Sequence, residues 1–147
     1  MAAIRNKKAH FDYEILDTIE AGIVLAGYEV KSLRAGHGKL EGARVLVRGG
    51  EAFLVGATIP AFQAANAPKE YDPSRPRKLL LHQKEIADIA AAEGQKGLTV
   101  VPISMYNRGR NLKVEIGIAR GKKKADKRET IKKRDTARDL ERSLKDR

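Results

Sequence analysis

The chain has 147 residues, of which 41% are hydrophobic, enough for one domain with a modest core. Its net charge of +11 and isoelectric point near 10.0 favour a polyanionic partner, most simply nucleic acid, with an anionic membrane surface as the rival. The absence of cysteine excludes disulfides, thiolate zinc sites and cysteine nucleophiles, and no apolar run has the length of a signal peptide core or a transmembrane helix. We therefore expect a cytoplasmic protein that needs no cofactor and no membrane.

The start of the chain predicts a flexible end followed by a strand. Residues 1–10 are small or basic, and we expect them to be flexible. Phe11 to Ile19 alternates apolar and polar side chains until Leu16 breaks the pattern, and this alternation predicts a strand.

The stretch Glu20 to Gly36 follows at once and organises the domain. Residues 21–25 form an apolar run of strand length, and Gly22 and Gly27 beside it suit the corners of a small barrel. The period then changes, and residues 30–34 have the spacing of a short helix.

The middle of the chain predicts a hairpin, a long loop and a helix. Residues 45–47 and 52–59 flank a Gly-Gly pair, which suits the primed turn of a β-hairpin. The segment 61–77 is rich in Ala and Pro and predicts the long loop of the domain. Residues 83–93 have the apolar spacing of an amphipathic helix that ends at Gly94.

A second strand pair follows that helix. Leu98 to Tyr106 and Leu112 to Ala119 alternate, with a turn over residues 107–111. Pro102 lies within the first of them, so we expect that strand to be at a sheet edge or bulged there. Five or six short strands with glycine corners and few helices predict an all-β fold with short helices: a small OB-type antiparallel β-barrel over residues 1–119.

The composition changes at Arg120. Residues 120–147 contain 13 Lys and Arg and six Asp and Glu, a net charge of +7 that leaves +4 on the 119 residues before them. Apolar residues beyond alanine are few, namely Ile131, Leu140 and Leu144, too few to offset the entropy of ordering. We expect a basic C-terminal tail that is disordered alone and helical in a negatively charged groove.

Residues that carry catalysis in other proteins are sparse. The histidines His10, His37 and His82 lie far apart and lack the spacing of metal ligands. Glu20 and Glu29 form a conceivable carboxylate pair, but they lie nine positions apart across a glycine corner, and most such pairs are structural. The sequence therefore predicts no enzyme.

Nucleic-acid binding is the better interpretation. Basic residues concentrate in the tail and in residues 75–78 and 108–113, which we expect outside strand interiors. The apolar residues 79–81 beside one of these groups suit a surface that packs against unstacked bases.

Five sequence blocks in order carry a family resemblance. They are NKKAHFDYEI (6–15), EAGIVLAGYEVKSLRAG (20–36), DPSRPRKLLLHQKEI (72–86), GLTVVPISMY (97–106) and KVEIGIARGKKKADKRETIKKRD (113–135). The chain therefore resembles the SsrA-binding proteins, also called small protein B, over about residues 5 to 138. The resemblance implies a bacterial RNA-binding protein with an OB-type barrel and a tail that is unstructured in isolation.

The resemblance also implies partners. Members of this family bind the tRNA-like domain of transfer-messenger RNA (tmRNA, or SsrA) and deliver it, with elongation factor Tu and GTP, to ribosomes stalled on messages without a stop codon. The tail then enters the empty mRNA channel near the small-subunit decoding centre and folds as a helix, which signals that no message remains. This ribosome rescue is called trans-translation.

By motif position, the resemblance implies three RNA-contacting residues: Glu20, Leu80 and Lys113. Lys113 suits a phosphate contact, Leu80 suits packing on a base or ribose, and Glu20 suits accepting hydrogen bonds from base edges or 2′-hydroxyls. Residue types alone favour a rim lysine, a core leucine and a barrel-corner carboxylate. The tail residues that match the ribosome-acting element are Lys122, Lys123, Asp126, Lys127 and Arg128.

Two places depart from the family pattern. Ala125 stands where the family usually has Tyr or His, so a stacking contact worth roughly 1–3 kcal/mol is absent or replaced. Residues 39–44 depart from the pattern usual after the short helix, so no RNA contact is carried over to them.

Two classes besides RNA delivery stay open on the residues themselves. One is a generic OB-type single-stranded nucleic-acid binder, whose affinity would rise with strand length and ignore RNA shape. The other is a ribosome-assembly or initiation-factor-like protein, which needs no tmRNA.

Overall fold

The computed structural model describes residues 2–63, 65 and 67–122, which fold around a seven-stranded antiparallel sheet of order β1-β6-β7-β2-β5-β4-β3. The strands are β1 (Ala2–Arg5), β2 (Tyr13–Ile23), β3 (Arg44–Arg48), β4 (Glu51–Val55), β5 (Arg77–Leu80), β6 (Leu98–Arg108) and β7 (Asn111–Gly121). The helices are α1 (Ala9–Asp12), α2 (Gly27–Arg34) and α3 (Gln83–Glu93). β3 and β6 come within 8 Å of each other in Cα positions, so the sheet curls toward closure as a barrel. The predicted all-β antiparallel barrel with short helices is confirmed.

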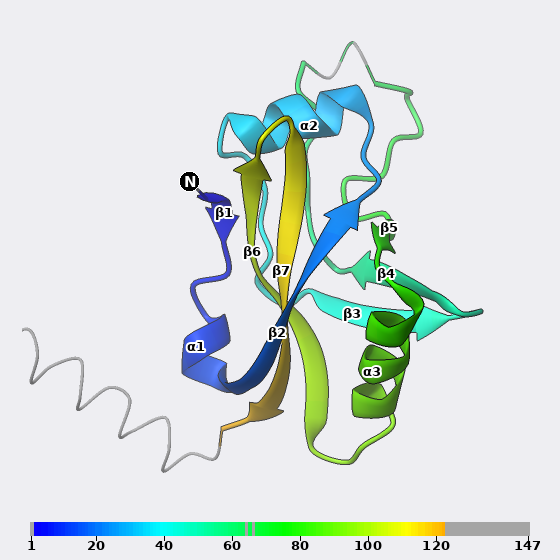
Figure 1. Ribbon diagram of the computed structural model, residues 1–147. Coiled ribbons are helices and arrows are strands. Elements are labelled where there is room, and N and C mark those ends of the chain that lie inside the picture. The colour runs from blue at the N-terminus through cyan, green and yellow to red at the C-terminus, as the bar shows by residue number, and fades with distance from the viewer. Residues whose placement is uncertain (1, 64, 66, 123–147) are drawn as a thin grey trace, which may run out of the picture.

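Figure 1 shows how the helices surround this barrel. The long strands β2, β6 and β7 run through its middle, α2 lies at one end, and β1 and α1 lie along one side. α3 lies on the other side, near β3. No helix in the described residues is long and apolar enough to cross a membrane.

Two bulges explain irregularities in the sequence pattern. The pairing of β2 with β7 shifts register between Ile15 and Asp17, so Leu16 has no residue opposite it and its side chain is 44% exposed. The pairing of β6 with β7 shifts between Pro102 and Ser104. The predicted bulge at Pro102 is therefore confirmed.

The N-terminal residues differ from the flexible end expected for residues 1–10. β1 pairs with β6, and Ile4 and Asn6 are buried. The Asn6 side chain donates from Nδ2 to the Pro102 carbonyl at 2.9 Å, and its backbone N–H donates to the Ile103 carbonyl at 2.8 Å. Phe11 lies in α1, so β2 begins two residues later than the alternation predicts. The bulge in β6 supplies the acceptors that hold this segment, and composition alone does not reveal it.

Other predicted elements are confirmed. The hairpin of β3 and β4 turns at Gly49 and Gly50, whose φ angles of 62° and 75° are those of a primed turn. The helix predicted over residues 83–93 is α3, followed by Gly94 at its C-cap.

The core contains a buried ion pair, and its arginine belongs to the basic residues 75–78 that were expected outside strand interiors. Glu29 on α2 and Arg77 at the start of β5 are both 0% exposed, and Arg77 donates to Glu29 Oε2 from Nε at 3.0 Å and from Nη2 at 2.7 Å. Tyr71 donates to the same oxygen at 3.0 Å, while Arg75 and the Ala26 N–H donate to Oε1. This network ties the long loop and β5 to α2.

Candidate nucleic-acid interface

Four neighbouring strands place one residue each in a row across the outer face of the sheet. Tyr106 on β6 lies opposite Lys113 on β7, Lys113 lies opposite Gly22 on β2, and Gly22 lies opposite Leu80 on β5. Directly opposite residues share a face of the sheet. The chain neighbours of these four residues are all buried and therefore point into the core. They are Met105, Val114, Ala21 and Leu79.

The three predicted RNA-contacting residues meet on this face. Glu20, Leu80 and Lys113 line one open hollow of about 370 Å³, together with Gly22, Leu81, His82 and Glu85. They come from three different strands and 93 positions of sequence, so only the fold brings them together. The structure thus places these predicted residues side by side, and their contact with RNA stays a prediction.

Leu80 is not the core leucine that its residue type favours. Its side chain is 55% exposed, more than either of the other exposed large hydrophobic side chains described, Leu16 at 44% and Val24 at 48%. Gly22 keeps the hollow open, because a Cβ there would lie 3.2 Å from Leu80 Cβ. An exposed leucine beside a glycine offers an apolar surface that a flat ring could cover.

Glu20 is held from β6. Tyr106 O–H donates to Glu20 Oε2, and Arg108 Nη1 donates to the same oxygen at 2.8 Å. These two hydrogen bonds, from Tyr106 first and Arg108 second, lower the pKa of Glu20. Burial and the Glu20 carboxylate raise the pKa of Tyr106 to about 12. The carboxylate is therefore ionised and the phenol protonated at neutral pH.

Cationic side chains border the face. A second hollow of about 290 Å³ shares Gly22, Leu80 and Lys113 with the first and adds Arg34 and Arg110. Its apolar lining is Ile23, Leu25, Val30 and Leu112. Arg34 on α2 donates from Nη2 to the Arg110 carbonyl at 2.8 Å, which braces the β6–β7 turn against the helix. Cations for phosphates beside apolar side chains for bases suit an RNA surface.

The predicted basic patch over residues 75–78 is wrong as a surface. Arg77 is buried and Arg75 pairs with Glu29. Lys78 is exposed but pairs with Glu51 at 3.0 Å. Glu29, which neutralises both arginines, lies more than 40 positions away in the sequence. The run of basic residues by itself therefore gives no sign that they are paired.

Glu20 and Glu29 do not form a carboxylate pair. Glu29 is in the core with Arg77, whereas Glu20 is on the outer face with Tyr106 and Arg108. No three side chains of His, Cys, Asp or Glu gather as metal ligands within the described ranges.

The predicted ribosome-acting residues lie elsewhere or outside the described residues. Lys122 follows β7 and donates from Nζ to the His10 carbonyl at 2.7 Å. It lies nine residues beyond Lys113, roughly 30 Å along an extended strand, so it does not join the hollow. Lys123, Asp126, Lys127 and Arg128 fall outside the described residues.

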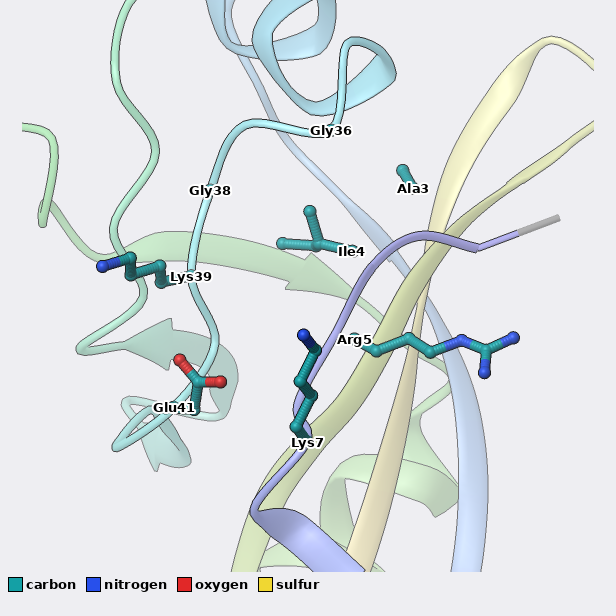
Figure 2. A pocket seen from close by; sticks show the side chains of 8 residues that line it. All are labelled: Ala3, Ile4, Arg5, Lys7, Gly36, Gly38, Lys39 and Glu41. Atoms are coloured by element: carbon teal, nitrogen blue, oxygen red, sulfur yellow. The ribbon is translucent and has the colours of Figure 1, made fainter.

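Another basic hollow lies away from these residues. Arg5, Lys7 and Lys39 line a space of about 420 Å³ between β1 and residues 36–41, and Glu41 also lines it (Figure 2). It contains none of the predicted site residues and includes part of the segment that departs from the family pattern.

Sequence reasoning missed Gly22 and Tyr106 as parts of the face, whereas Arg108 belongs to the basic residues 108–113 that it assigned to nucleic-acid binding. Tyr106 and Arg108 lie at the end of a strand and in its turn, where aromatic and basic residues are common. The alternation of β6 did place Tyr106 on the face opposite Met105, but it could not show that β2 lies two strands away in the sheet.

Comparisons with known proteins identify relatives of this chain. The protein-family model described as SmpB protein matches residues 3–146. An SsrA-binding protein from Chloroflexus aurantiacus (strain ATCC 29366 / DSM 635 / J-10-fl) is 51% identical over 140 residues, covering 95% of this chain and 88% of the relative. An SsrA-binding protein from Roseiflexus sp. (strain RS-1) is 50% identical over 142 residues, covering 97% and 90%.

A solved structure is also similar. It is described as "tmRNA-SmpB: a journey to the center of the bacterial ribosome", and one of its chains superposes with a TM-score of 0.69 at 45% identity. The match covers 82% of this chain and 84% of the other. With a family model matched over nearly its whole length and relatives at about half identity, this chain belongs to the SmpB protein family.

Proposed function

We propose that the protein binds the tRNA-like domain of tmRNA and delivers it to stalled ribosomes for trans-translation. The observation that carries this proposal is the meeting of Glu20, Leu80 and Lys113 in one hollow on the outer face. Relatives named SsrA-binding protein and the similarity to a tmRNA–SmpB structure support the choice of RNA.

Each residue of the hollow suits a different part of a nucleotide. The Lys113 ammonium pairs with a phosphate, and Leu80 packs on an unstacked base or ribose. The Glu20 carboxylate accepts a hydrogen bond from a base amino group or a ribose 2′-hydroxyl. Attraction to phosphates alone does not select for these groups. A site with all three reads a folded RNA loop better than a uniform strand.

The C-terminal tail has a separate role in this proposal. Residues 1–119 act as the RNA-binding barrel, and the tail of residues 120–147, whose first two residues pair in β7, enters the empty mRNA channel near the decoding centre. There Lys122, Lys123, Asp126, Lys127 and Arg128 contact the ribosome. The tail's net charge of +7 supports this assignment, since ribosomal RNA is a polyanion. Elongation factor Tu with GTP accompanies the delivery, which takes place in the cytoplasm and includes no catalytic step by this chain.

The proposal is tested by RNA selectivity and by tagging. Fluorescence anisotropy compares a labelled tRNA-like domain of tmRNA with an elongator tRNA and a single strand of equal length, each at two salt concentrations. We expect tight binding to the first RNA alone, and tmRNA-dependent tagging of a nascent chain on ribosomes without a stop codon. Equal affinity for all three RNAs, collapsing with salt, would instead identify a generic OB-type binder. Ribosome binding without tagging would identify an assembly factor.

A further inference from the structure

The strongest unassigned feature is the way in which Glu20 is held. Tyr106 and Arg108 both donate to Oε2, and no hydrogen bond joins Oε1 to any described residue. Each carboxylate oxygen has about two lone-pair sites, so these two donors fill Oε2. Oε1 keeps its full capacity to accept.

The two donors reach Glu20 across an intervening strand. Tyr106 and Arg108 belong to β6, Glu20 belongs to β2, and β7 lies between these strands in the sheet. The carboxylate is therefore anchored to a second part of the barrel instead of rotating freely on its own strand. Its side chain is 34% exposed, so the remaining oxygen is open to a ligand.

We propose that Tyr106 and Arg108 are positioning residues for RNA recognition: they hold one oxygen of Glu20 and present the other to a neutral hydrogen-bond donor of a nucleotide. The donor is a ribose 2′-hydroxyl or a base amino group, because an ionised carboxylate only accepts and phosphates donate nothing. This inference rests on the proposed RNA binding at the same face.

Arg108 has a second effect on the same contact. Its guanidinium offsets the negative charge of Glu20, which would otherwise repel the phosphates that Lys113 attracts. Because its side chain is 69% exposed, Arg108 can also contact a phosphate itself. Tyr106 is therefore the cleaner residue to test.

A double-mutant cycle separates positioning from a general structural role. Tyr106→Phe, Glu20→Gln and the double variant are compared with the full-length chain in binding a labelled tRNA-like domain at one salt concentration. We expect Tyr106→Phe to weaken binding about three- to tenfold, because the RNA then meets a carboxylate that is held less firmly but is still present. In the Glu20→Gln background the same change should alter affinity by less than about twofold, since the positioned group is gone.

Controls guard against a loss of fold. Tyr13→Phe removes a hydroxyl at the far end of β2 and should leave affinity unchanged. Thermal unfolding should give the same Tm for Tyr106→Phe as for the unmodified chain. If Tyr106→Phe unfolds more easily, Arg108→Gln replaces it in the same cycle. Additive effects in the cycle, or no effect of Tyr106→Phe and Arg108→Gln, would overturn the inference.

The class of donor is identified on the RNA. Single 2′-deoxy nucleotides and bases lacking an amino group are placed in turn along the tRNA-like domain. We expect one of these changes to weaken binding to the unmodified chain but not to Glu20→Gln, and its kind identifies the sugar or the base. If no change behaves in this way, Glu20 accepts from no nucleotide donor and the inference fails. If the unmodified tRNA-like domain fails to bind the unmodified chain, the proposed function itself is wrong.

Discussion

At the scale of single residues, the stability of the fold depends on the buried carboxylate of Glu29. Burial raises the pKa of Glu29, but the hydrogen bonds from Arg75, the Ala26 N–H and Arg77 outweigh it, and the pKa lies below its ordinary value of 4.5. Glu29 neutralises two arginines that would otherwise be buried or half-buried without an anion. Removing one partner of a buried ion pair lowers the free energy of unfolding strongly, because the other charge stays buried alone. Replacing both partners by apolar residues changes it far less.

Glu29→Gln should therefore lower the free energy of unfolding by about 3–5 kcal/mol, because Arg77 stays buried without its counter-ion. Urea unfolding measures this change. The control is Glu51→Gln, which removes an exposed pair with Lys78 and should cost about 0–1 kcal/mol. Equal effects of the two variants would mean that the buried network contributes nothing special.

The same residue predicts a pH dependence of stability. Because the folded pKa of Glu29 is depressed, its contribution is complete above its ordinary value of 4.5 and is lost as pH falls through the folded pKa. The difference in unfolding free energy between the unmodified chain and Glu29→Gln should thus narrow below pH 4.5. A difference that stays constant down to pH 3 would contradict this assignment of the pKa.

Gly22 offers a test of the hollow that spares the charges. Gly22→Val should fill the space beside Leu80 and weaken binding to the tRNA-like domain tenfold or more, equal to about 1.4 kcal/mol. Stability should also fall somewhat, because the new Cβ meets Leu80 Cβ, which moves only with the β5 backbone, so urea unfolding is measured beside the affinity. Gly27→Ala is the matched control, since nothing lies within 4 Å of a Cβ there. Loss of affinity in both variants would point to the backbone and not to the hollow.

Single residues are where sequence reasoning has least power. Leu80 and Lys113 were placed by resemblance, and residue type alone favoured the core for Leu80, which is 55% exposed. Glu29 and Arg77 looked like surface charges because their partners are distant in sequence. What decides burial for these residues is the partner supplied by the fold.

At the scale of elements, β1 is the one whose stability rests on a few polar contacts. Three of its four residues pair with β6, and Asn6 continues the attachment where β6 bulges at Pro102. The Asn6 side chain lies between the Pro102 and Leu40 carbonyls, at 2.9 and 3.4 Å. One amide thus joins β1, the β6 bulge and the segment that follows α2.

Asn6→Ala should release this edge of the barrel. It leaves the buried Pro102 carbonyl without its donor, which costs about 1–3 kcal/mol. Hydrogen exchange should then speed up for the amides of β1 by more than the loss of global stability explains. The amides of β3 and β4 should change only by the amount that the global free energy of unfolding changes. Uniform acceleration over all strands would show that β1 has no separate opening.

Elements with a strong local signal were predictable. The Gly-Gly turn of the β3–β4 hairpin and the helix from Gln83 to Glu93 follow from residues within the elements themselves. β1 was not predictable, because a short strand with basic neighbours forms only when the bulged β6 offers acceptors. The start of β2 was misplaced for a related reason: the alternation continues through α1, and its Phe11 fits either element.

At the scale of the whole molecule, the charge is distributed unevenly. Residues 120–147 carry +7 of the net +11, and the barrel places its cations around an apolar hollow. Specific affinity should therefore come from the barrel, and much of the salt-dependent attraction from the tail.

A chain that ends at Lys122 tests this division. It retains the pairing of β7 with Tyr13 and the contact of Lys122 with His10, so it should unfold at nearly the same urea concentration. We expect it to keep most of its specific affinity for the tRNA-like domain but to support no tagging on stalled ribosomes. Tagging at the level of the full-length chain would show that the tail has no part in delivery.

We propose that the face formed by Glu20, Leu80 and Lys113 binds the tRNA-like domain. Fluorescence anisotropy with Leu80→Ala and Lys113→Ala checks this proposal, each variant beside a control of the same residue type. Leu16→Ala removes another exposed leucine, and Lys96→Ala removes an exposed lysine in the turn before β6.

We expect Leu80→Ala and Lys113→Ala each to weaken binding about tenfold, equal to about 1.4 kcal/mol, and neither control to do so. Lys113→Ala should also reduce the slope of log K against log salt by about 1, as expected for one lost phosphate contact. If Leu16→Ala and Lys96→Ala weaken binding as much as the variants of the face, the RNA is held by general charge and the assigned face is wrong.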